Sequence, residues 1–309
     1  MKKIFTEMSS WSQLFFLWLF FVVGLFISSL LVVMLAFFFI EGGNIYDIAS
    51  LLAESPDYLR ISQLVQQVLL FFIPACFCAY LFNKNTSSYL KINQKPPINQ
   101  TTFAVFLIFT IQPFISFTSY YNRHMKLPEF MSGVEVWFQN SENAAMMMLE
   151  RLLAGNSIET LVFNLFIVAV VAAIVEEFFF RGVLQQIINK ITNNYHWAIW
   201  ITAFIFSAVH MQFYGFVPRL LLGALLGYLF VFSGSLWVPI IVHFINNAAG
   251  VLLYYFYKGT PQYESIENIG AKDMWWTAVL SFVLTAIILY YMSREYTRKS
   301  KNIYSDLWN

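Results

Sequence analysis

Two carboxylates and a guanidinium close an almost unbroken apolar run that extends from Leu161 to Val175. They belong to Glu176, Glu177 and Arg181. On insertion scales a single charge near the bilayer centre costs about 2.5–3.5 kcal/mol, so three would cost on the order of 8 kcal/mol unless they were paired or reached by water. Charges kept inside a membrane at this cost mark a candidate functional site.

The spacing predicts different roles for the two carboxylates. Glu177 and Arg181 are four residues apart, with the acid on the N-terminal side, which is the favourable order for an ion pair on one helix face. Glu176 lies about 100° around the helix from Glu177. It is therefore free to face another group, and a free carboxylate suits a general base that takes a proton from water.

Three polar residues on later apolar segments can join this carboxylate. Glu176 and His210 are each 17 residues from Asn193, which lies in the turn between two predicted spans. In an antiparallel hairpin they reach similar depth and could activate one water. His243 and Asn247 are four residues apart, so they share a helix face. Counting places His243 nearer the end of its span, so convergence requires a tilt or a re-entrant start.

These residue types suit the activation of a water by a general base. No serine or cysteine is among the convergent positions, so a covalent acyl-enzyme is not expected. The alternatives are a proton-coupled membrane transporter, whose Glu/His chain would relay protons, and an inactive immunity or scaffold protein. Transporters often contain inverted repeats, whereas no repeat is visible here and the polar groups fall in one half.

The composition predicts an integral membrane protein. Of its 309 residues 59% are hydrophobic and 11% are charged, against about 25% charged residues in soluble domains. The net charge is +1 and no basic cluster contains interleaved aromatics, so the expected partner is the lipid bilayer and not nucleic acid. Cys76 and Cys78 lie two apart in an apolar run and are expected to be core residues, not a disulfide or a metal pair.

We predict an all-α fold, a polytopic bundle of about eight transmembrane helices, because about 20 apolar residues cross a bilayer. The predicted spans are 11–40, 61–82, 103–121, 158–186, 196–211, 216–233, 236–257 and 275–292. The first is too long for the apolar core of a signal peptide and should be retained. Residues 134–155 predict an amphipathic interfacial helix, for which a packing or surface role is favoured over a lid.

The distribution of basic residues predicts the orientation. With the N-terminus inside, ten Lys and Arg fall in cytoplasmic segments and six in outer segments, in agreement with the positive-inside rule. Both termini are then cytoplasmic. The lack of a visible targeting signal favours a multi-pass protein of a bacterial cytoplasmic membrane.

Three ordered motifs resemble those of the CPBP intramembrane proteases, the family of the CAAX prenyl endopeptidases and bacteriocin-processing or self-immunity proteins. The motifs are Glu176-Glu177-x-x-x-Arg181, Phe206-x-x-x-His210 and His243-x-x-x-Asn247. The resemblance covers about residues 158–257, a catalytic helix core. Residues 1–157 would then hold N-terminal spans and the amphipathic segment, and residues 258–309 a loop, the last span and a cytoplasmic tail.

The resemblance implies a role for each motif position. Glu176 would be the base that activates water, and His210 would share that water. His243 and Asn247 would bind or stabilise the oxyanion. Supporting roles are implied for the remaining motif positions, Glu177, Arg181 and Phe206, the last packing behind His210.

The family is commonly called metalloprotease, and the residues leave this open. Glu176, His210 and His243 could hold Zn²⁺ or another divalent metal, as three-ligand catalytic sites do. A Glu bound to the metal could not also be the free base, so a metal-free Glu/His mechanism is slightly preferred. The expected substrate is a membrane-embedded or lipidated peptide, such as a prenylated protein or a bacteriocin leader. The oligomeric state stays open.

Other polar and small residues have structural interpretations. Arg219, one residue after a proline near a helix start, is predicted to extend to the lipid headgroups. His124 and His196 are predicted to be interfacial. Gly223 and Gly227 form a small-xxx-small face that predicts tight packing within the chain.

Overall fold

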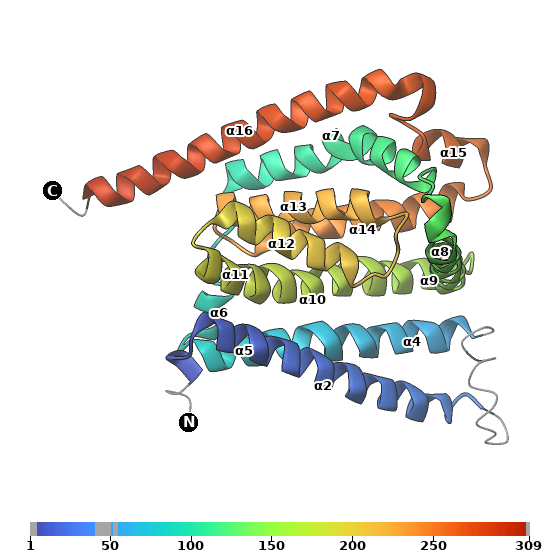
Figure 1. Ribbon diagram of the computed structural model, residues 1–309, viewed down its shortest axis with the longest axis horizontal. Coiled ribbons are helices and arrows are strands. Elements are labelled where there is room, and N and C mark those ends of the chain that lie inside the picture. Colours follow the sequence, from blue (N-terminus) through green and yellow to red (C-terminus); the bar gives the residue numbers. More distant parts are fainter. Residues whose placement is uncertain (1–4, 41–50, 52–54, 307–309) are drawn as a thin grey trace.

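The protein is a bundle of helices that run roughly alongside one another (Figure 1). The computed structural model describes residues 5–40, 51 and 55–306, and within these ranges it contains helices and no strand. The α-helices are α2 (Ser10–Ala36), α4 (Pro56–Gln67), α5 (Ile73–Phe82), α6 (Thr86–Tyr89), α7 (Ile98–Arg123), α8 (Ser132–Leu153), α9 (Ile158–Asn164), α10 (Ala172–Phe179), α11 (Gln185–Thr192), α12 (Tyr195–Ala208), α13 (Phe216–Ser233), α14 (Trp237–Tyr257), α15 (Pro261–Glu267) and α16 (Trp275–Asp306). Short 3₁₀ turns cover Glu129–Met131 and Lys272–Met274.

Seven helical stretches among the described residues are long and apolar enough to cross a membrane, which confirms a polytopic helical membrane protein. The remaining predicted span, 196–211, is occupied by α12. Its 14 residues rise about 21 Å, less than the ~30 Å of a hydrocarbon core. α12 nevertheless returns the chain along α11, and α2 begins at the same end of the bundle at which α16 ends (Figure 1). The cytoplasmic location of that end stays a prediction.

The predicted amphipathic segment is the helix α8, which lies with α15 at the opposite end of the bundle (Figure 1). Its apolar side chains Met146, Met147 and Leu149 are exposed. An exposed apolar face on a helix beyond the spans agrees with an interfacial position.

Within the described ranges, three π-helical segments interrupt the long helices. η2 (Val68–Phe72) joins α4 to α5, while η4 (Leu165–Val171) and η5 (Phe180–Leu184) flank α10. Each π turn inserts extra residues into a helix and changes which residues face a neighbour, and such turns are frequent at functional sites. The helix α10, which carries Glu176, therefore has a π-helical segment at each end, and each segment changes which residues face a neighbouring helix.

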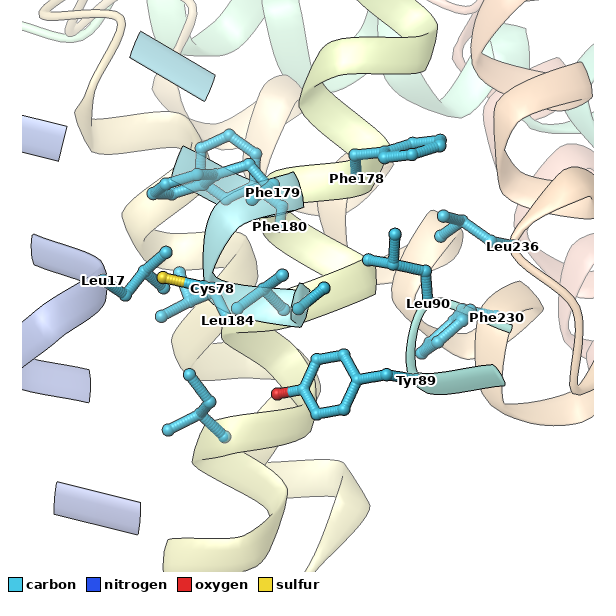
Figure 2. Close-up of a cluster of buried hydrophobic side chains, with 14 of the residues drawn as sticks. Leu17, Cys78, Tyr89, Leu90, Phe178, Phe179, Phe180, Leu184, Phe230 and Leu236 are labelled. Atoms are coloured by element: carbon cyan, nitrogen blue, oxygen red, sulfur yellow. The ribbon is translucent and has the colours of Figure 1, made fainter. Parts of the chain in front are cut away.

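A buried apolar cluster fixes α10 and η5 within the bundle. Phe178, Phe179 and Phe180 lie at its centre, with Leu90 and Leu236 against the same helix (Figure 2). Leu90 comes from the loop between α5 and α7, and Leu236 immediately precedes α14. Within a bilayer, van der Waals packing of this kind drives helix association, so these side chains hold the helix in place.

The loop before α7 determines where α14 begins. The Leu236 amide donates to the carbonyl of Lys91 at 3.3 Å, and the Trp237 indole donates to the carbonyl of Ile92 at 2.8 Å. The Leu236 side chain lies 3.5 Å from where a Cβ on Gly182 would be. α14 therefore starts beside η5, and its seventh residue, His243, reaches α10. The contact between His243 and Glu177 is therefore made from the first two turns of α14.

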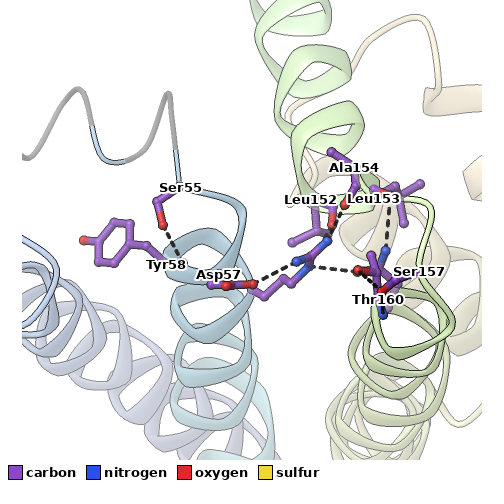
Figure 3. Close-up of polar contacts among 10 residues, drawn as sticks. Ser55, Asp57, Tyr58, Leu152, Leu153, Ala154, Ser157 and Thr160 are labelled. Atoms are coloured by element: carbon purple, nitrogen blue, oxygen red, sulfur yellow. Dashed lines mark hydrogen bonds and ion pairs between the residues drawn. The ribbon is translucent and has the colours of Figure 1, made fainter.

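A buried arginine of α4 ties this helix to the end of α8 and to α9; its partners Asp57, Leu152 and Ala154 are labelled in Figure 3. The Arg60 Nε donates to the carbonyl of Leu152 at 3.1 Å and to Asn164 Oδ1 at 3.0 Å. Its Nη2 donates to the carbonyl of Ala154 at 2.6 Å, and its Nη1 pairs with Asp57 at 2.9 Å. One guanidinium thus satisfies two backbone carbonyls that end α8.

Replacing Arg60 by lysine is expected to loosen the end of α8, because one ammonium group cannot reach all four acceptors. Each buried acceptor left without a donor costs about 1–3 kcal/mol. Hydrogen exchange at residues 150–156 should become faster. The control is Arg123→Lys, because Arg123 is exposed and, among the described residues, bonds only to Ser119 one turn earlier. Equal exchange in the two variants would contradict the role of Arg60.

Candidate active site

The predicted ion pair between the second motif carboxylate and the arginine is present and fully buried. Arg181 Nη1 donates to Glu177 Oε1 at 2.6 Å, and both side chains have no exposed surface. Arg181 Nη2 donates to the carbonyl of Gly223 at 2.8 Å, and its guanidinium lies 4.9 Å from the centre of the Phe206 ring. These contacts join α10 and η5 to α12 and α13.

Glu177 has a second partner that the spacing did not predict. Its Oε1 also accepts a hydrogen bond from His243 Nδ1 at 2.8 Å. A carboxylate that pairs with Arg181 can only accept, so His243 Nδ1 carries the proton of this bond. His243 Nε2 lies 3.8 Å from Glu176 Oε2. Glu177 thus orients the imidazole toward Glu176.

A cavity of about 330 Å³ lies where α10, the end of α12, α13 and α14 meet, with α7 along one side. Its polar lining comprises Ser119, Glu176, His210, Arg219, His243, Asn246 and Asn247. The cavity brings together all four residues predicted to be catalytic. The Glu176 side chain is 14% exposed. It takes no part in the ion pair between Glu177 and Arg181.

His210 follows the last turn of α12 and is anchored by its own helix. Its Nδ1 lies 2.8 Å from the carbonyl oxygen of Phe206. A carbonyl can only accept, so Nδ1 carries the proton and Nε2 is left for a molecule in the cavity. The Phe206 ring packs edge-on against the His210 ring with centroids 5.2 Å apart, as the resemblance implies.

Asn247 is held by a π-helical carbonyl. Its Nδ2 donates to the carbonyl of Val168 in η4 at 3.0 Å, and its Oδ1 accepts from Asn246 at 3.3 Å. Asn246 Oδ1 in turn accepts from Gln112 of α7 at 3.1 Å. The sequence interpretation omitted Asn246 and Gln112, whose only signal was their polarity inside apolar spans.

The prediction for Arg219 was wrong. Instead of extending to the headgroups, its side chain turns inward and lines the cavity. Its Nη2 donates to Gln212 Oε1 at 2.7 Å, and Gln212 lies in the segment between α12 and α13. A polar partner inside the bundle therefore draws the side chain away from the lipid.

Ser119 is a second lining residue that the sequence interpretation missed. Its Oγ accepts hydrogen bonds from Arg123 Nε and Nη2 at 3.3 and 3.0 Å. No recorded bond joins this hydroxyl to an imidazole of the described residues. Ser119 thus lacks the adjacent base that activates a serine nucleophile.

The small-residue face of α13 packs tightly within the chain, as predicted. A Cβ on Gly227 would lie 2.8 Å from Gln185 Oε1, and one on Gly223 3.1 Å from Phe206, so this face packs within the chain. Cys76 and Cys78 are free thiols.

The donor set of the cavity does not fit a resident divalent metal. Among the residues that the structure describes, no group of three or more His, Cys, Asp or Glu side chains is close enough to hold one. The guanidinium of Arg219 lies in the same cavity, and its positive charge opposes a divalent cation beside it.

Comparison with known proteins finds a family match over α9 to α14, which supply most of the cavity lining. Residues 158–249 match the family model described as type II CAAX prenyl endopeptidase, Rce1-like. The uncharacterized protein YpbD of Bacillus subtilis (strain 168) is 34% identical over 80 residues, which are 25% of this chain. An uncharacterized 24.3 kDa protein of Escherichia coli is 27% identical over 111 residues, which are 34% of this chain.

The chain spans only 38% and 50% of the lengths of these two relatives. No solved structure matches the chain significantly. The family match contains all three motifs and every helix from α9 to α14 up to residue 249. It agrees with the resemblance drawn from those motifs: residues 158–249 of this multi-pass membrane protein are similar to the Rce1-like family.

Proposed function

We propose that the protein is an intramembrane endopeptidase that hydrolyses peptide bonds with a water activated by Glu176 and His210. The observation that carries the proposal is the convergence of Glu176, His210 and His243 on one cavity within the helix bundle. The Rce1-like match to residues 158–249 supports the same reaction class.

The side chains divide the reaction among them. Glu176 takes a proton from water while His210 Nε2 holds that water in position. The water oxygen bonds to the peptide carbonyl carbon, and the electron pair of the C=O bond moves to its oxygen. His243 and Asn247 line the same cavity as Glu176 and His210. The C–N bond then breaks, and Glu176 returns the proton to the leaving amine.

The proposed substrate is a membrane-embedded or lipidated peptide. A second cavity of about 520 Å³ adjoins the first, and both are lined by Ile108, Ser119, Pro218, Leu222 and Asn246. Its further lining includes apolar residues of α7 and α14, among them Phe109, Ile115 and Leu253. An apolar chamber next to the polar one suits a substrate that arrives from the bilayer.

The direct test compares membrane peptides of cells that carry or lack the gene. We expect at least one membrane-associated polypeptide to persist uncleaved in the deletion strain and to be cleaved again when the wild-type gene is restored. Identical sets of termini in the two strains would contradict the proposed activity.

Treatment with a strong chelator is expected to leave hydrolysis by the purified protein unchanged, because the cavity lacks a three-ligand metal set. Metal analysis of the purified protein should give much less than one ion per chain. Inactivation by the chelator that added Zn²⁺ reverses would instead require a metal held by Glu176, His210 and His243, and would overturn the metal-free mechanism.

A further inference from the structure

Arg219 introduces a positive charge into the cavity that the three motifs do not account for. It lines the same cavity as Glu176 and His210. Its hydrogen bond to Gln212 Oε1, at 2.7 Å, occupies one of the five N–H groups of the guanidinium. Its Nη1 is buried and has no hydrogen-bond partner among the described residues. The guanidinium is thus anchored at one side and retains donors.

The chain before α13 leaves space for this guanidinium. A Cβ on Gly215 would lie 2.9 Å from Arg219 Nη2 and 3.4 Å from Nη1. Any larger side chain at Gly215 would therefore displace the group. Gln212 and Gly215 together position Arg219, one by a hydrogen bond and the other by the absence of a side chain.

Two carboxylates lie in the neighbourhood of the guanidinium, that of Glu176, which lines the same cavity, and that of Glu142. Glu142 lies on α8 and Glu176 on α10. Within the described part of the chain, neither carboxylate forms a hydrogen bond with the Arg219 guanidinium. Arg219 Nη1 is thus left without an acceptor, and a buried donor without a partner is costly. A buried cation that is attracted to the base but not bonded to it remains available to a substrate group.

We propose that Arg219 is a catalytic residue that stabilises the oxyanion of the hydrolysis; this inference rests on the proposed function. When the water oxygen bonds to the carbonyl carbon, its proton passes to Glu176 and the carbonyl π electrons move to the carbonyl oxygen. One negative charge thereby leaves Glu176 and appears on that oxygen. Arg219 donates to the new oxyanion, and the charge of the cavity stays constant.

This charge balance distinguishes an oxyanion from a carboxylate of the substrate. While Glu176 is ionised, a second negative group in the cavity would be repelled. Once Glu176 is protonated, Arg219 can accommodate one anionic oxygen. The site is therefore arranged for a charge that develops during the reaction, which is where electrostatic stabilisation is most effective. Asn247 is less available, because its Nδ2 already donates to Val168.

An anion-binding measurement tests this without any proteolytic assay. The Glu176→Gln variant mimics the protonated base. Acetate should raise its unfolding temperature in detergent by about 2–4 °C in a saturable manner, relative to chloride at equal ionic strength. The Glu176→Gln/Arg219→Gln protein should lose this rise, and the wild-type protein, with Glu176 ionised, should show little. No saturable rise in the single variant, or an equal rise in the double variant, would overturn the anion site.

The kinetic measurement uses the membrane polypeptide that the deletion strain identifies. Arg219→Gln should lower kcat about 10²–10³-fold with KM nearly unchanged, and Arg219→Lys should restore part of kcat. Gly215→Ala displaces the guanidinium without removing it and should lower kcat less, which gives a second test if Arg219→Gln does not fold. A normal kcat for Arg219→Gln would overturn the catalytic role of Arg219 and leave the proposed function standing. Acetate binding that depends on Arg219 in a protein that cleaves nothing would support the anion site but overturn the proposed function, and with it the catalytic role of Arg219.

Discussion

The Glu176→Gln variant is expected to lose about 10²–10⁴-fold in the rate of hydrolysis, the contribution of a general base. Glutamine has the shape of the native side chain but cannot take a proton from water. The Glu176 side chain is 14% exposed and its Oε2 stands 3.8 Å from His243 Nε2. The loss should therefore appear in kcat for the membrane polypeptide that accumulates in the deletion strain, measured in proteoliposomes.

The fold should tolerate this substitution. Glu176 makes no recorded hydrogen bond among the described residues, and removal of a partly buried charge relieves its desolvation. The unfolding temperature of Glu176→Gln in detergent should equal or exceed that of the wild type. Glu264→Gln on the exposed helix α15 is the matched control and should change neither property. Normal turnover by Glu176→Gln would remove Glu176 from the role of base.

The helical spans and one ion pair could be predicted because they depend on local rules. The length and polarity of the apolar runs identify helices that cross a membrane. The spacing of Glu177 and Arg181 fixes their contact within one helix, and the equal distances of Glu176 and His210 from Asn193 fix their depth. Each of these inferences needs only the geometry of a helix or of a hairpin.

The remaining features of the site depend on contacts between distant parts of the chain. The contact of His243 with Glu177 requires α14 to start beside Gly182, which the loop carbonyls of Lys91 and Ile92 help to fix. The π-helical segments on either side of α10 do not follow the 3.6-residue period from which the sequence is interpreted.

Arg219 was misassigned for a similar reason. A cation near a helix start in an apolar segment usually extends to the headgroups. Here Gln212, Gly215 and the segment between α12 and α13 draw it inward. A sequence pattern gives the position of a residue along its helix but not the partner that another segment brings.

Replacing Glu177 by leucine is expected to destabilise the protein by about 3–5 kcal/mol, the cost of leaving a buried charge without its partner. Arg181 has no exposed surface, and its Nη1 has Glu177 as its partner at 2.6 Å. The substitution also removes the acceptor of His243 Nδ1, so His243 loses its orientation. Thermal unfolding in detergent measures the first effect and hydrolysis the second.

The double variant Glu177→Leu/Arg181→Met separates the two effects. Replacing both members of a buried pair by apolar groups of similar volume is often neutral for stability, so most of the lost stability should return. Hydrolysis should stay low, because nothing then holds the His243 ring toward Glu176. Glu150→Leu is the control, since its pair with Lys258 is exposed and contributes about 0–1 kcal/mol. If activity recovered together with stability, the Glu177 carboxylate would support only the fold. His243 would then not need an acceptor for its Nδ1.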